Sequence, residues 1–138
     1  MNHELKDSNG RVYLTISVDN TNQLIYVEWS GYLSEEFVTT GAMAYLKIME
    51  ENNYHSVIND NTMVIGTWDH SMNWVLTNWA TQAAKSGLTH LAMLFRDHTS
   101  AESSALTLYN KVSAFQVKVF NDKDQAINWI KQYSLKAS

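Results

Sequence analysis

A chain of 138 residues is long enough to form one domain with its own core, without a metal or a disulfide. Cysteine is absent, which excludes disulfide bonds, thiol nucleophiles and cysteine-bound metals and favours a cytoplasmic protein. The net charge of −4, with ten scattered Lys and Arg residues, argues against a nucleic-acid partner. No apolar run reaches the roughly 18 residues of a membrane span, and the polar stretch 1–11 is unlike a signal peptide.

The first predicted elements are two strands that form a hairpin. Apolar and polar residues alternate from Val12 to Val18, which is the period of a strand with one wetter face. A polar turn follows at 19–22, and Leu24 to Trp29 forms the second strand. The short connection predicts antiparallel pairing.

The next predicted element is a helix that begins at Ser34 and ends at Asn52-Asn53. Ser34 is the expected N-cap, and Glu35 and Glu36 suit the positive end of the helix dipole. Apolar residues from 37 to 49 form a wide stripe that predicts its buried face.

The central strand is predicted at 55–60, where Val57 and Ile58 stand between polar residues. A polar turn is expected to begin at Asn59. After a loop that contains Gly66, an amphipathic helix is predicted from Ser71 to Ser86.

Both ends of this helix carry signals. Asp69 or Ser71 is the expected N-cap, and Gly87 supplies the left-handed residue that ends it. Trp74 projects to roughly the opposite side from the apolar stripe, and Trp68 lies in the preceding loop. These two tryptophans either fill a secondary packing layer or a dimer contact, or form the wall of a ligand pocket.

Two strands, each followed by a helix, complete the chain. The strands are predicted at 88–95 and 115–120. Capping patterns open the following helices at Thr99 to Glu102 and at Asp122 to Gln125, and the first of these helices runs through Val112.

The element order is therefore β-β-α-β-α-β-α-β-α, in one domain spanning 1–138. Strands that alternate with helices imply right-handed crossovers and parallel pairing. We predict an α/β fold with a single mixed, mostly parallel five-stranded sheet and an antiparallel N-terminal hairpin strand.

This order, together with particular residues, resembles the STAS fold group of anti-sigma-factor antagonists, and more closely small STAS/CRAL-TRIO-like bacterial proteins of unassigned function. The resemblance spans nearly the whole chain. The residues that carry it are Val57-Ile58-Asn59-Asp60, Gly66, Trp68, Trp74, Ala83, Ala84, Gly87, Phe120-Asn121-Asp122, Ala126 and Trp129-Ile130.

The resemblance implies a phosphorylated serine at the start of the helix after the central strand, which switches binding to a kinase partner. This chain lacks the family's Asp-Ser-Ser-Gly signature and reads Asn61-Thr62-Met63 after Asp60. Ser71 stands at a comparable helix start and Thr62 follows the strand, so these two residues are the candidate phosphorylation sites.

Polar residues gather where the parallel strands end, which is where open sheets bind ligands. Asp60 and Thr62 follow the central strand, His98 follows the next one, and the helix start at Ser71 offers free N–H groups to an anion. We expect the site on this edge.

Enzymatic and metal-binding interpretations of the same edge are weaker. Catalysis would pair His70 or His98 with Asp60, Asp69 or Asp97, with Ser71 or Thr62 as nucleophile, and a metal would use His70, His98, Asp60 and Asp97. No nucleophile elbow, zinc motif or phosphate loop is present. We therefore expect no enzyme, no metal and no cofactor.

Two functions remain. The first is a non-enzymatic interaction or regulatory module of STAS-like type, whose contact face includes Trp68, Ser71 and Trp74 and which can pair as a homodimer. The alternative is a binder of a small apolar or amphipathic ligand in a CRAL-TRIO-like pocket lined by Trp68 and Trp74, with Met63 or Met72. Asp60, Thr62 and His98 complete the expected ligand-binding or partner-binding set.

Overall fold

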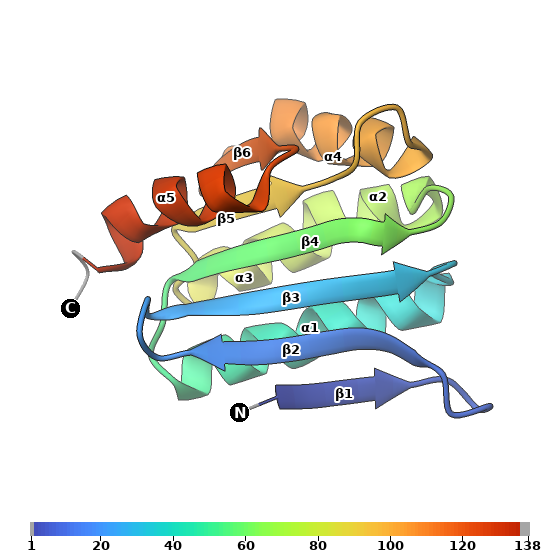
Figure 1. Ribbon diagram of the computed structural model, residues 1–138, viewed down its shortest axis with the longest axis horizontal. Coiled ribbons are helices and arrows are strands. Elements are labelled where there is room, and N and C mark those ends of the chain that lie inside the picture. Colours follow the sequence, from blue (N-terminus) through green and yellow to red (C-terminus); the bar gives the residue numbers. More distant parts are fainter. Residues whose placement is uncertain (1, 136–138) are drawn as a thin grey trace.

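The computed structural model describes residues 2–135, in which one mixed sheet carries helices on both faces (Figure 1). Met1 and 136–138, the ends of the predicted domain, lie outside the described residues. The strands follow one another across the sheet in chain order, antiparallel from β1 to β3 and parallel from β3 to β6. They are β1 (Asn2–Lys6), β2 (Val12–Asp19), β3 (Leu24–Gly31), β4 (Ser56–Val64), β5 (His90–Leu94) and β6 (Gln116–Phe120).

The predicted mixed and mostly parallel α/β sheet is confirmed, but the described residues form six strands rather than five. The additional strand is β1, which pairs along β2 from Asn2 opposite Ser17 to Lys6 opposite Val12. Leu5 is the one aliphatic residue of β1, and alternate positions are exposed. An edge strand with so little apolar surface gives almost no periodic signal in the sequence.

The helices divide unequally between the two faces of the sheet. Figure 1 shows α5 alone in front, while α1, the helical stretch from α2 to α3, and α4 lie behind. The larger core lies on that rear side, and a smaller core joins α5 to β4, β5 and β6. The helical segments are α1 (Glu35–Glu51), η1 (Asp69–Ser71), α2 (Met72–Trp74), η2 (Val75–Trp79), α3 (Ala80–Lys85), α4 (Ser100–Lys111) and α5 (Lys123–Ser134).

Two of the predicted N-caps are confirmed. The Ser34 hydroxyl accepts from the backbone N–H of Phe37 at 3.1 Å, and the Asp122 carboxylate accepts from that of Gln125 at 2.9 Å. Gly87 has φ of +104° and ends α3 in the predicted left-handed conformation. The sequence was sufficient to predict these helix ends because each depends on residues within one turn of the helix.

At the other two predicted caps, the described residues form no capping hydrogen bond from a side chain, although Thr99 is the N-cap residue of α4 as predicted. The Thr99 hydroxyl donates to the carbonyl of Arg96, and Glu102 accepts from the N–H of His98 instead of that of Thr99. His98 has φ of +60°, and its left-handed turn brings that N–H to Glu102. At the central helix neither Asp69 nor Ser71 caps the first turn. The Asp69 carboxylate instead accepts from Ser104, which ties the loop to α4.

The central strand is longer than predicted, and the expected turn at Asn59 is wrong. β4 continues through Asn59, Asp60 and Asn61 to Val64, and these three polar residues are buried. Glu28 of β3 pairs with Asp60, but Ser30 pairs with Met63, so β4 contains one extra residue at this point. The extra residue is a β-bulge, a feature that is frequent beside functional sites.

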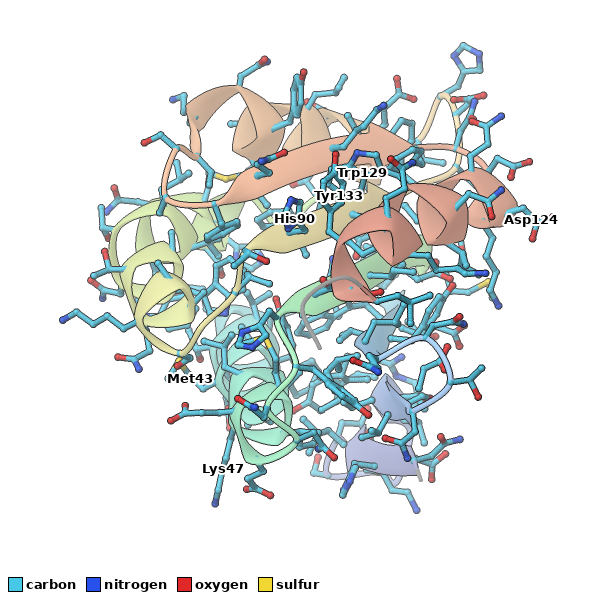
Figure 2. The ribbon with its side chains drawn as sticks, turned by 90° about the vertical axis from the view of Figure 1, so that its left-hand side faces the viewer. Met43, Lys47, His90, Asp124, Trp129 and Tyr133 are labelled. Carbon is cyan, nitrogen blue, oxygen red and sulfur yellow. The ribbon has the colours of Figure 1, made fainter. Side chains whose placement is uncertain are left out.

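An aromatic cluster joins α5 to the amino end of β5. Figure 2 shows His90 beside Trp129 and Tyr133, which both project from α5. The His90 ring stacks on Tyr133 at 3.9 Å between centroids and meets the edge of Trp129 at 5.7 Å. Its Nε2 is buried without a hydrogen-bond partner in the described part of the chain, and burial lowers the His90 pKa below its ordinary 6.5.

This burial predicts a pH dependence of stability. Because the pKa of His90 is lower in the folded protein, the unfolded chain takes up the proton first as the pH falls. The contribution of neutral His90 to the free energy of unfolding is therefore retained above about pH 6.5 and lost as the pH falls below it. His90→Phe keeps the stacked ring and removes the titration, so we expect a flatter profile of unfolding free energy between about pH 7 and about pH 5. Urea titrations at each pH measure this, and parallel profiles would contradict it.

Candidate functional site

The candidate site is built on the polar triplet Asn59-Asp60-Asn61 in the middle of the sheet. Central strands of parallel sheets are normally almost continuously apolar, because both of their faces are covered. Here the three residues are only 7%, 5% and 3% exposed. Successive strand residues point to opposite faces, so Asn59 and Asn61 face the rear helices while Asp60 and Thr62 face the side of α5. The triplet therefore supplies polar groups to two separate places.

On the rear side the two asparagines form a hydrogen-bonded chain that begins at Trp29. The indole Nε1 of Trp29 donates to Asn59 Oδ1 at 2.7 Å, and Asn59 Nδ2 donates to Asn61 Oδ1 at 3.1 Å. An indole can only donate, which fixes the orientation of both amides along the chain. The last group, Asn61 Nδ2, is buried with no acceptor among residues 2–135. The chain therefore ends in a free donor.

Both asparagines line a cavity of about 40 Å³ between the sheet and the rear helices. The walls come from β3, β4, β5, the loops after β3 and β4, and the helices α1, η2 and α4. The lining residues are Trp29, Leu33, Val38, Ala42, Tyr45, Asn59, Asn61, Trp68, Val75, Trp79, Leu91, Met93 and Leu108. The volume exceeds the roughly 10–15 Å³ that one water needs and lies far below the roughly 300–1,000 Å³ of drug-sized pockets.

Two further features mark this cavity. Tyr45 is 4% exposed, its hydroxyl makes no hydrogen bond to the described chain, and burial raises its pKa above the ordinary range. Val75 and Trp79, the first and last residues of the π-helical segment η2, also line it. π-helical turns are rare and occur frequently at functional sites, because they re-aim side chains that a regular helix would place elsewhere.

On the other face Asp60 is held by neighbouring donors. Its carboxylate accepts from the Tyr26 hydroxyl at 2.5 Å and from the backbone N–H and hydroxyl of Thr62 at 2.9 and 2.7 Å. Burial, and then the hydrogen bond to Asp60, raise the pKa of Tyr26 above its ordinary range. The Lys123 ammonium lies 4.8 Å from the centre of the Tyr26 ring. These contacts give both carboxylate oxygens of Asp60 a hydrogen-bond partner.

A cluster of exposed hydrophobic side chains lies where β3 and β4 end. Tyr32 is 70% exposed, Met63 56% and Ile65 49%, and we call these three residues the rim patch. Ile65 donates its backbone N–H to the carbonyl of Gly31 at 3.0 Å, which holds the two chain segments together. The Tyr32 ring lies above Gly66, whose φ is +81°. Tyr32 and Ile65 were not among the predicted site residues.

Comparison with known proteins gives one informative likeness. No protein-family model matches the chain, and no curated protein does. A solved structure that matches is that of an uncharacterized protein of the DUF3478 family from Shewanella loihica PV-4, described as having a SpoIIAA-like fold. It covers 85% of this chain and 91% of its own, with 15% identity and a TM-score of 0.54. The fold is SpoIIAA-like.

The likeness confirms the STAS-like resemblance at the level of fold. At 15% identity it carries nothing about ligand, partner or mechanism to this chain.

Of the two candidate phosphorylation sites, Ser71 is buried and Thr62 is half-buried. Ser71 is 2% exposed, and its hydroxyl lies 2.8 Å from His70 Nδ1. His70 Nε2 lies 2.7 Å from the carbonyl of Leu33, and because a carbonyl can only accept, Nε2 donates this hydrogen bond. Thr62 is half-buried and gives its hydroxyl proton to Asp60. A kinase would reach the Ser71 hydroxyl only after this segment moved away from the core.

The remaining predicted residues do not converge on one point. Trp68 is 6% exposed and lines the cavity, whereas Trp74 is half-buried against the core and is not part of the cavity wall. Met63 is exposed, and Met72 is buried away from the cavity. His98 is exposed on the loop after β5, and no hydrogen bond or ion pair within residues 2–135 joins it to Asp60 or Ser71.

The described residues also limit the chemistry that this edge supports. Within them, no three His, Asp or Glu side chains come together as a metal site would require.

Across 2–135, no helix combines the length and apolar character needed to cross a bilayer. Ser71 is buried, whereas its partner His70 is exposed and contacts a backbone carbonyl instead of a carboxylate. A catalytic dyad would need an exposed nucleophile.

Proposed function

We propose that this chain is a non-enzymatic protein-interaction module of STAS-like type, whose partner binds at the rim patch. The single observation that carries the proposal is the exposure of Tyr32, Met63 and Ile65 side by side at the ends of two neighbouring strands. Proteins rarely leave several large hydrophobic side chains together in water unless another surface covers them.

The proposed contact differs from the one expected from the sequence. Trp68 and Ser71 are buried, so they support the loop beneath the patch without touching a partner. Tyr32 and Met63 supply aromatic and methionine side chains, which are enriched at protein interfaces. The burial of the Ser71 hydroxyl, and the backbone carbonyl that takes the place of a carboxylate beside His70, also favour a binding role over catalysis.

The proposal is tested by removing two apolar side chains of the rim patch, one at the end of β4 and one in the loop after it. We expect the double variant Met63→Ser/Ile65→Ser to weaken partner binding or self-association by about tenfold or more, because interface anchors carry most of the binding energy. Sedimentation velocity over a range of concentrations measures self-association, and capture from the host extract under crosslinking measures other partners.

Met43→Ser is the matched control. Met43 is 43% exposed on α1 (Figure 2), whereas the rim patch lies where β3 and β4 end, so the substitution removes a similar side chain from another element. Unfolding curves identify any loss of fold. Equal behaviour of the wild type and the double variant in both binding assays would count against the proposal.

A further inference from the structure

The free polar groups of the cavity are hydrogen-bond donors. Both side-chain oxygens of the asparagine chain already accept, from Trp29 and from Asn59, while Asn61 Nδ2 is unpartnered within the described residues. The Tyr45 hydroxyl is also free to donate. A buried donor without an acceptor destabilises a fold, so its retention at a cavity wall needs an explanation. A ligand that accepts these hydrogen bonds supplies it.

The residues that line the cavity favour an uncharged ligand. Among the described residues, no ionisable side chain except Tyr45 lines the cavity, and Tyr45 stays neutral because burial raises its pKa. A carboxylate or phosphate would lose its hydration here without gaining an opposite charge, which is strongly unfavourable. A neutral oxygen acceptor, such as a ketone, aldehyde or amide carbonyl, can instead take hydrogen bonds from Asn61 and Tyr45.

The volume of the cavity and its tryptophan side chains indicate the size and the apolar character of the ligand. About 40 Å³ holds a group of a few heavy atoms and excludes a lipid chain. The indoles of Trp29, Trp68 and Trp79 present apolar surface to it. We propose that this cavity binds a small neutral carbonyl compound, with its oxygen on Asn61 Nδ2 and its apolar part against the tryptophans.

The structure also indicates the route of entry. Leu33 and Trp68 line the cavity from the two loops that follow β3 and β4. His70 joins these loops through its contact with the Leu33 carbonyl at 2.7 Å. Opening at that contact would admit a ligand at the edge that carries the rim patch. None of the rim patch residues lines the cavity, so ligand binding can be measured on the free protein without a partner.

Acetone is the probe for this site, since it pairs one carbonyl with two methyl groups. Acetate has the same number of heavy atoms and a charge, and xenon is an apolar atom that makes no hydrogen bond. Titration of the full chain is followed by ¹H–¹⁵N spectra, in which the Asn61 amide and the three cavity indoles report directly. We expect saturable acetone shifts in the millimolar range, as suits so few heavy atoms, and no saturable shifts with acetate.

Two variants identify the donors. Tyr45→Phe removes a hydroxyl that makes no hydrogen bond in the described chain, so the fold should persist while acetone binds about fivefold more weakly. Asn61→Leu should weaken acetone binding further and leave xenon binding in place. Because Asn61→Leu also deprives Asn59 of its acceptor, Tyr45→Phe carries the test if that variant does not fold.

Several results of these titrations would contradict carbonyl binding in the cavity. Absence of saturable acetone shifts, equal binding of acetate, or unchanged acetone affinity in a folded Asn61→Leu variant would overturn the proposal. Where Asn61→Leu does not fold, unchanged affinity in Tyr45→Phe would overturn it.

Discussion

Trp79→Ala is expected to lower the free energy of unfolding by about 3–5 kcal/mol. Trp79 is 2% exposed, and its ring meets Tyr45 at 6.0 Å and Phe115 at 5.7 Å in edge-on contacts. Its indole also donates to the carbonyl of Ala42 at 3.3 Å. Alanine would lose all of these contacts and enlarge the cavity, into which the surrounding strands cannot fully collapse.

Trp74→Ala, in the same helical stretch, is the matched control for this substitution. Trp74 is half-buried and lies outside the cavity wall, so we expect a loss of about 1–2 kcal/mol. Chemical denaturation followed by far-ultraviolet circular dichroism measures both values without depending on tryptophan fluorescence. Free indole should raise the stability of Trp79→Ala and leave that of the wild type unchanged. Equal losses in the two variants would contradict the assignment of Trp79 to the core.

The sequence predicted the arrangement of the fold well, because its main signals are local. The alternation at 12–18, the turn at 19–22 and the caps at Ser34 and Asp122 each specify structure within a few residues. Because strands and helices alternate after residue 54, few topologies are possible, and the parallel order of β3 to β6 is the main one among them. β1 was missed because it is an edge strand with one aliphatic residue.

The site was less predictable because its residues contradict local preferences. Asn and Asp are depleted in strands, so the triplet at 59–61 predicted a turn. The apolar residues on both sides of it, Val57-Ile58 and Met63-Val64-Ile65, were the available signal of a nine-residue strand with a polar centre. The π-helical segment was not detectable, because its apolar residues also fit the spacing of an ordinary helix.

Long-range pairing explains the remaining differences. The free donor of Asn61 exists only because Trp29, 30 residues before Asn59, begins the amide chain. Ser71 is buried because His70 bridges to the Leu33 carbonyl, 37 residues away. Sequence spacing carries no information on either contact. The sequence predicted one site at the carboxyl edge, and it gave no sign of a cavity behind the sheet separate from an exposed patch.

Gly41→Val is expected to lower the free energy of unfolding by about 3 kcal/mol, because this helix position has no room for a side chain. A Cβ at Gly41 would lie 2.5 Å from Cη2 of Trp29 and 2.7 Å from a terminal methyl of Leu14. The leucine methyl can rotate away. The Trp29 ring cannot move freely, because its Nε1 is bound to Asn59 at 2.7 Å.

Gly41→Ala distinguishes packing from helix propensity through the sign of its effect. Alanine favours a helix interior by about 1 kcal/mol over glycine, so propensity alone predicts stabilisation. Crowding against Trp29 predicts a net loss, and in a Trp29→Leu background, where the ring is absent, the same alanine should become neutral or stabilising. Denaturant titrations of the four proteins of this cycle measure the coupling. A stabilising Gly41→Ala in the wild-type background would show that the indole moves freely, and that the amide chain from Trp29 to Asn61 is not rigidly held.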